Sequence, residues 1–264
     1  MESSESRIRY GLSHWSREED EQKALDQYLR LADKAFNRTA IKQFLDMTGE
    51  VSGKRILDYG GGAGIMAVTY ARAGADVVLV DAEANALRTA RFYARRAEVE
   101  EHVVTLHSTS FPSALRDERF DIVLAKDIIE HIEEDQKFLD DLSNCQEPGG
   151  ILLLSTQNSY SLNYLLEGSY QKYWCGNVGW CGWDLTHLRF YTPTSLRKKL
   201  EKAGYRVERW SSVYLVPYDI LSWLSLLKIR IDMPALHHCD LSIGRYFPFN
   251  RLGWNMIVRA RREK

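Results

Sequence analysis

The chain has 264 residues, of which 45% are hydrophobic and 27% are charged, and its formal net charge at pH 7 is −1. This length is enough for one well-cored domain with embellishments and does not require two. A near-neutral charge disfavours a nucleic-acid-binding surface, which is usually basic, so we expect no nucleic-acid partner. The polar N-terminus lacks a signal-peptide pattern, and the most apolar window, about residues 213–231, contains charged residues and a proline. We therefore expect a cytoplasmic protein with no transmembrane segment.

The N-terminal region, residues 1–49, is predicted to form a helical cap. Apolar side chains recur at three- and four-residue spacing from about Arg17 to Met47, with a break expected near Asn37. Ser16 followed by Glu19 three residues later predicts a capping box at the start of the first helix.

Residues 50–156 alternate between short apolar runs and helical patterns. The apolar runs are Arg55–Tyr59, Asp76–Val80, His102–His107, Phe120–Ala125 and Gly150–Thr156, and helices are expected at Ile65–Ala73, Ala84–Ala97 and Asp135–Cys145. Short strands that are apolar throughout and separated by helices indicate a parallel sheet with helices on both faces. The pattern therefore predicts an α/β, Rossmann-like fold.

The pattern changes after Thr156. A helix is expected at Thr192–Gly204, and two final strands at Tyr205–Tyr214 and Asn255–Arg261. Insertions are expected at about residues 157–191 and 217–250. The first is rich in aromatic residues and glycines, which fits either a lid over a flat or apolar ligand or a satellite hydrophobic cluster. The second contains an apolar helix that we expect to form a pocket wall or a homodimer contact, with a membrane-surface contact as the third alternative.

A glycine-rich turn follows the first predicted strand, in the segment Ile56–Gly64 (ILDYGGGAG). Glycines there let the backbone approach a ligand closely and present amide groups to it. The glycines alone are ambiguous, because they also fit a dinucleotide fingerprint that ends at Ala67. Asp58 precedes the glycines, where a carboxylate suits the ammonium of a bound amino acid and does not suit a pyrophosphate. Asp81, at the tip of the next strand, can accept ribose hydroxyls from either ligand.

Several segments together resemble the class I S-adenosylmethionine-dependent methyltransferase superfamily, especially the branch of ubiquinone-biosynthesis O-methyltransferases. They span about residues 50–214 in the family's order and spacing, and they are Ile56–Gly64, Val78–Asp81, Phe120–His131, Gly149–Asn158 and His187–Pro193 with Ala203–Tyr205. The resemblance implies a seven-stranded, mostly parallel sheet with an antiparallel last strand. It also implies S-adenosylmethionine as the cofactor and residues 50–264 as a class I methyltransferase domain.

By this resemblance, nine positions are expected to bind the cofactor. Asp58 would lie near the amino group of its methionine portion, and Asp81 would bind its ribose hydroxyls. The other positions are assigned to the methionine and ribose portion (Gly60, Gly62, Gly64, and Lys126 through its backbone) and to the adenine (Ala82, with Ser108 or Thr109 replacing the acidic residue often found after the third strand).

Two histidines are the candidate catalytic residues, because methyl transfer requires alignment of the acceptor and, where needed, removal of its proton. His131 either faces the acceptor or packs under the cofactor. His187 either contacts the acceptor or, with Arg189, holds its own loop in place. No metal site is predicted: the cysteines lack C-x-x-C spacing, and the candidate oxygen ligands lie on one short segment (Asp127, Glu130 and Glu133).

The sequence therefore predicts an enzyme that methylates an oxygen or nitrogen of a small aromatic, lipid-like or glycosyl metabolite. One alternative is methylation of RNA or protein, which the near-neutral charge disfavours. The other is a non-catalytic cofactor-binding module, which the intact glycine loop and Asp81 disfavour.

Overall fold

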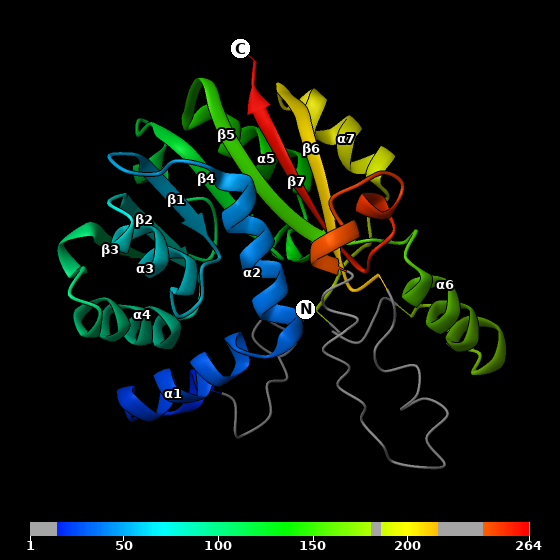
Figure 1. The fold of residues 1–264 in the computed structure, drawn as a ribbon, viewed down its shortest axis with the longest axis horizontal. Coiled ribbons are helices and arrows are strands. Elements are labelled where there is room, and N and C mark those ends of the chain that lie inside the picture. Colours follow the sequence, from blue (N-terminus) through cyan, green and yellow to red (C-terminus); the bar gives the residue numbers. More distant parts are fainter. Residues whose placement is uncertain (1–14, 181–185, 216–239, 264) are drawn as a thin grey trace.

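Seven strands form a single sheet in the order β3-β2-β1-β4-β5-β7-β6. The computed structural model describes residues 15–180, 186–215 and 240–263 (Figure 1). β7 is antiparallel to both of its neighbours, β5 and β6, and the other neighbouring pairs are parallel. The strands are β1 (Arg55–Tyr59), β2 (Asp76–Asp81), β3 (Val103–His107), β4 (Phe120–Lys126), β5 (Gln146–Gln157), β6 (Tyr205–Val213) and β7 (Asn255–Arg262). The predicted mostly parallel sheet with an antiparallel last strand is confirmed.

Except for α6, which lies in the first insertion where the sequence predicts no helix, the helices begin and end close to their predicted positions. They are α1 (Glu21–Ala32), α2 (Ala35–Thr48), α3 (Ile65–Arg72), α4 (Ala84–Arg96), α5 (Asp135–Asn144), α6 (Leu162–Ser169) and α7 (Pro193–Lys202). The expected capping box at Ser16 is wrong, because α1 begins after Asp20, whose carboxylate accepts a hydrogen bond from the amide of Lys23 at 2.9 Å. The break between the first two helices lies at residues 33–34, slightly before the expected position near Asn37.

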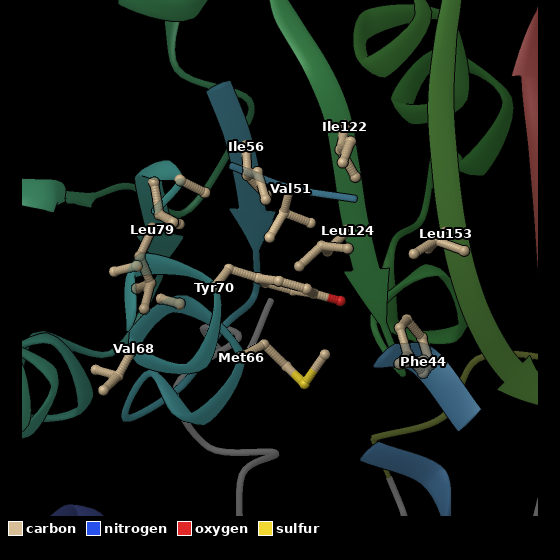
Figure 2. Close-up of a cluster of buried hydrophobic side chains, with 14 of the residues drawn as sticks. Phe44, Val51, Ile56, Met66, Val68, Tyr70, Leu79, Ile122, Leu124 and Leu153 are labelled. Atoms are coloured by element: carbon tan, nitrogen blue, oxygen red, sulfur yellow. The ribbon is translucent and has the colours of Figure 1, made fainter. Parts of the chain in front are cut away.

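Helices cover both faces of the sheet, with one hydrophobic cluster under each layer. The first cluster packs α2, α3 and α4 against the sheet, and Figure 2 shows Phe44 of α2, Met66 of α3 and Leu124 of β4 within it. The second cluster packs Leu139 of α5 and Leu196 of α7 against the opposite face. Burying a side chain such as Phe44, which is 0% exposed, contributes roughly 2 kcal/mol, so α2 is held firmly beside the central strands.

The strand order indicates where along the sheet a ligand would bind. Chain connections lead from β1 outward to β2 and β3, and then back across to β4 on the other side of β1. In open α/β sheets, ligands bind outside the carboxyl ends of the strands at such a reversal. The ends of β1 and β4 are therefore the expected site. In the part of the chain that the structure describes, no helix is long and apolar enough to cross a membrane.

Candidate cofactor and acceptor site

A cavity of about 310 Å³ lies at the carboxyl ends of β1 and β4, the edge that the strand order identifies. The glycine loop forms one wall, and the N-terminal segment with α1 and α2 forms the other. The lining residues are Trp15, Tyr28, Leu31, Ala32, Asn37, Ile41, Asp58, Gly60, Gly61, Gly62, Ile65, Met66 and Lys126. The cavity therefore brings together four of the nine positions predicted to bind the cofactor: Asp58, Gly60, Gly62 and Lys126.

Asp58 is an acid buried in the wall of this cavity, with 1% of its surface exposed. Its Oδ2 atom has no hydrogen-bond partner among the described residues. Burial, with the nearby charge of Asp81 adding to it, raises the pKa of Asp58 to about 7. A buried carboxylate oxygen without a donor costs free energy, and a cationic ligand in the cavity would relieve that cost.

The glycine loop can approach a ligand because two of its residues adopt backbone conformations that side chains disfavour. Gly60 has φ of 75° and Gly62 has φ of 58°. Gly61, which the sequence analysis did not single out, has a steric requirement instead. A Cβ atom there would lie 2.6 Å from Asp58 Oδ2 and 3.0 Å from a carbon of Leu79, which is closer than van der Waals contact permits.

Asp81 links the end of β2 to the glycine loop. Its two carboxylate oxygens accept hydrogen bonds from the amides of Gly62 and Glu83, each at 2.8 Å. Burial raises the pKa of Asp81 even though these amides lower it. Each oxygen retains a second lone pair, so the carboxylate can accept further hydrogen bonds from hydroxyl groups.

The remaining predicted cofactor positions do not line the cavity. Gly64 is the N-cap of α3, where an added Cβ would lie 3.2 Å from the Cβ of Ala90, so the glycine also permits close helix packing. Ala82 and Ser108 follow the adjacent strands β2 and β3, and the Ser108 hydroxyl donates to the Ser110 carbonyl at 2.7 Å. Thr109, the next residue, is exposed. Their assignment to the adenine stays a prediction.

The N-terminal helices contribute two aromatic side chains that the sequence analysis missed. The Tyr28 hydroxyl accepts a hydrogen bond from the amide of Ile65, at the start of α3, at 3.2 Å. The ring of Trp15 packs on that of Tyr28 with centroids 4.9 Å apart. The hydrogen bond between Tyr28 and Ile65 joins residues 37 positions apart, so no local spacing in the sequence indicates it.

Lys126 carries the positive charge of the cavity. Its ammonium lies 2.6 Å from Oδ2 of Asp127, which adopts a left-handed conformation with φ of 53°. Oδ1 of Asp127 accepts hydrogen bonds from the Ser155 hydroxyl at 2.7 Å and the Asn255 amide at 2.5 Å. Strands β4, β5 and β7 therefore all contribute to the position of the Lys126–Asp127 pair.

The two predicted catalytic histidines lie side by side, although 56 positions separate them. The ring centroids of His131 and His187 are 4.8 Å apart, and the Thr186 hydroxyl lies 2.9 Å from Nδ1 of His131. Glu130 adjoins them and is fully buried. Its Oε2 accepts a hydrogen bond from the Thr156 hydroxyl at 2.8 Å, and its Oε1 has no partner among the described residues.

We refer to Glu130, His131 and His187 as the histidine–glutamate cluster. Burial, together with the charge of Asp127, raises the pKa of Glu130 to about 8. One potential ligand atom from each residue lies within 4.8 Å of the others, so the cluster could hold a metal ion. Of the three acidic candidates considered from the sequence, only Glu130 belongs to it. The same three groups could instead accept and pass on a proton.

A buried network fixes the segment that carries His187. The Tyr191 hydroxyl donates to Asp135 at 2.7 Å, and Lys199 and Arg189 pair with the same carboxylate at 2.8 and 3.0 Å. The amide of Leu188 donates to the Glu130 carbonyl at 2.9 Å, next to the histidines. Arg189 thus helps to hold the loop that carries His187, which agrees with one of the two interpretations of this segment given by the sequence.

Aromatic side chains continue from the histidine–glutamate cluster toward α6. Phe190 lies 6.2 Å from His187, 4.8 Å from Tyr164 of α6 and 5.4 Å from Trp254, measured between ring centroids. The first predicted insertion therefore contains a hydrophobic cluster beside the candidate catalytic residues. Most of the second insertion lies outside the described residues, and so does its predicted apolar helix.

The chain belongs to the methyltransferase-domain family, whose sequence profile matches residues 18–209. It is 31% identical over 172 residues to a ubiquinone biosynthesis O-methyltransferase from Nitrobacter winogradskyi, which covers 64% of this chain and 62% of that protein. It is 30% identical over 181 residues to the protein of the same name from Aeromonas salmonicida, covering 69% and 75%. The chain thus matches less than two thirds of the length of the first relative.

The fold is also that of solved methyltransferase structures. The magnesium protoporphyrin IX methyltransferase from Synechocystis PCC 6803, crystallised with bound SAH, superimposes with a TM-score of 0.59 at 16% identity, over 92% of this chain and 96% of that chain. The resemblance to class I methyltransferases that the sequence analysis described is therefore confirmed for both family and fold.

Proposed function

We propose that this protein is an S-adenosylmethionine-dependent methyltransferase that transfers a methyl group to an oxygen atom of a small molecule. The observation that carries the proposal is the unpartnered, buried oxygen of Asp58 beside a glycine loop that leaves no room for a side chain at Gly61. Membership of the methyltransferase-domain family and the similarity to relatives named O-methyltransferases support it.

The residues of the cavity fit this cofactor. Asp58 would bind the ammonium of its methionine portion, and Asp81, with lone pairs still available, would accept its ribose hydroxyls. Gly60, Gly61 and Gly62 would let the backbone lie against it. The bound cofactor would supply an activated methyl group on its sulfonium, so the protein has to align the acceptor and remove a proton.

The histidine–glutamate cluster is the proposed proton acceptor. Either histidine can take a proton from an acceptor hydroxyl, since a neutral imidazole nitrogen can act as a general base. Thr186 orients the His131 ring, and the buried network at Asp135 holds His187 beside it. The aromatic side chains around Phe190 would contact an acceptor with a flat or apolar part. A cytoplasmic location and a homodimer stay predictions.

The test is to incubate the purified protein with S-adenosylmethionine labelled in its methyl group and with separate small-molecule, RNA and protein fractions. We expect label in a small-molecule product whose mass and chemistry identify a methylated hydroxyl. Asp81→Ala should lose both cofactor binding and labelling, since it removes the expected ribose contact. Label confined to RNA or protein would overturn the assigned substrate class, and absence of cofactor binding by the wild-type chain would overturn the function.

A further inference from the structure

We propose that the Lys126 side chain binds the carboxylate of the cofactor's methionine portion, opposite Asp58. The two side chains would form a clamp for an amino-acid zwitterion. The inference rests on the proposed function, because it concerns the same cofactor. It goes beyond a backbone contact at this position, since it gives the ammonium a role of its own.

The charges lining the cavity suggest this clamp. Among the lining residues in the described part of the chain, Asp58 is the only acid and Lys126 is the only base. An amino-acid head group carries one ammonium and one carboxylate, and each needs a partner of opposite charge when it leaves water. Asp58 can serve the ammonium, which leaves Lys126 as the described cavity residue able to neutralise the carboxylate.

The backbone geometry is compatible with one ligand that contacts both side chains. Asp58 of β1 is in register with Leu124 of β4, so Lys126 lies two residues further along the neighbouring strand. With strands about 4.8 Å apart and a rise of about 3.3 Å per residue, the Cα atoms of Asp58 and Lys126 are separated by roughly 8 Å. The two side chains and a head group between them can span that distance.

Asp127 holds the ammonium of Lys126 without consuming its binding capacity. The ion pair between them uses one of three ammonium protons as a hydrogen-bond donor. Ser155 and Asn255 fix the Asp127 carboxylate from two other strands, so Lys126 is anchored before any ligand arrives. Such preorganisation lowers the entropy cost of binding.

The charge balance of the site also favours a ligand of this kind. Burial lowers the pKa of Lys126, but the charges of Asp127, Glu130 and Asp58 raise it by more, and the net shift is upward. Lys126 is therefore a firmly protonated cation among three acids. S-adenosylmethionine has a sulfonium, an ammonium and a carboxylate, so it adds positive charge near the acids while its one anionic group faces the lysine.

The test compares two ligands by isothermal titration calorimetry: S-adenosylmethionine and decarboxylated S-adenosylmethionine, which lacks only the carboxylate. Lys126→Met should weaken binding of the first by about ten- to hundredfold and change binding of the second by less than about threefold. Lys126→Arg keeps the charge and should retain most of the wild-type preference. Asp58→Asn is the matched control, because it should weaken both ligands, which share the ammonium.

The outcomes separate the inference from the function on which it rests. The inference is overturned if the ratio of the two affinities is the same in Lys126→Met and in the wild-type protein. A general loss of structure would lower both affinities together and leave that ratio unchanged, and thermal melting of each variant identifies such a case. In that event Lys126→Gln, which also removes the charge, replaces Lys126→Met, and an unchanged ratio in the folded Lys126→Gln protein overturns the inference. If the wild-type chain binds neither ligand, the proposed function itself fails.

Discussion

The affinity for S-adenosylmethionine should fall as the pH is lowered from 7.0 to 5.5. Asp58 must be ionised to bind the ammonium of the cofactor, and its pKa without ligand is about 7. The ionised fraction falls from about one half at pH 7.0 to about 3% at pH 5.5, so the dissociation constant should rise about sixteenfold. Affinity falls toward acid pH because the pKa of Asp58 is raised, and below that pKa the protonated, uncharged carboxyl is the dominant form.

Glu130 and the amino group of the cofactor contribute little to the pH dependence in this window. The pKa of Glu130 is about 8, so this acid is already mostly protonated at pH 7.0. The α-amino group of the cofactor stays protonated below pH 7. Isothermal titration calorimetry at several pH values gives the dissociation constants, and buffers with different ionisation enthalpies give the protons released on binding.

Asp58→Asn is the control that isolates this acid. It should bind the cofactor more weakly at pH 7.0, because an amide cannot neutralise an ammonium, and its affinity should change little down to pH 5.5. The reasoning is refuted if wild-type affinity is constant across the window, or if Asp58→Asn shows the same dependence on pH as the wild-type protein.

Three further outcomes are expected. Gly61→Ala should abolish cofactor binding in calorimetry, since the new Cβ would collide with the Asp58 carboxylate. At Gly62 a new Cβ meets open space, but φ is left-handed, so Gly62→Ala should cost only about 1–2 kcal/mol of stability in urea unfolding. If Gly62→Ala abolished cofactor binding as Gly61→Ala does, the steric argument would be contradicted. Tyr191→Phe should lower kcat while leaving the cofactor dissociation constant unchanged, because the lost hydrogen bond to Asp135 loosens the segment that carries His187. A matching loss of cofactor affinity would argue against a role of Tyr191 in positioning His187. Activity should survive prolonged treatment with EDTA, since the histidine–glutamate cluster can accept a proton without a metal, whereas loss of activity that added divalent cation restores would identify the cluster as a metal site.

The fold could be predicted from the sequence largely because its strands and helices are marked by local patterns. Apolar runs that end at acids or glycines located β1 and β2, and Pro193 marked the first turn of α7, which begins with a capping box of Thr192 and Ser195. The start of α1 was misplaced because Ser16 and Asp20 both belong to the residue types that cap helices. The backbone settles on the residue whose side chain reaches a free amide.

The candidate site was predictable only where its residues follow strands. Asp58 and Asp81 end neighbouring parallel strands, so a shared location could be inferred before the structure. The proximity of His131 and His187 depends on the Asp135 network, which joins α5, α7 and the loop before α7. Tyr28 likewise reaches the cavity through helix packing. Contacts of this kind arise from tertiary structure and leave no spacing in the sequence.

The position of β7 has a consequence for the order in which the molecule assembles. It is the last strand along the chain, yet it lies between β5 and β6, and it supplies the Asn255 amide that holds Asp127. During synthesis on the ribosome, β5 has an open edge and β6 has no strand to pair with until residues 255–262 emerge. The Lys126–Asp127 pair therefore gains its hydrogen bond from Asn255 only after β7 has paired with β5 and β6.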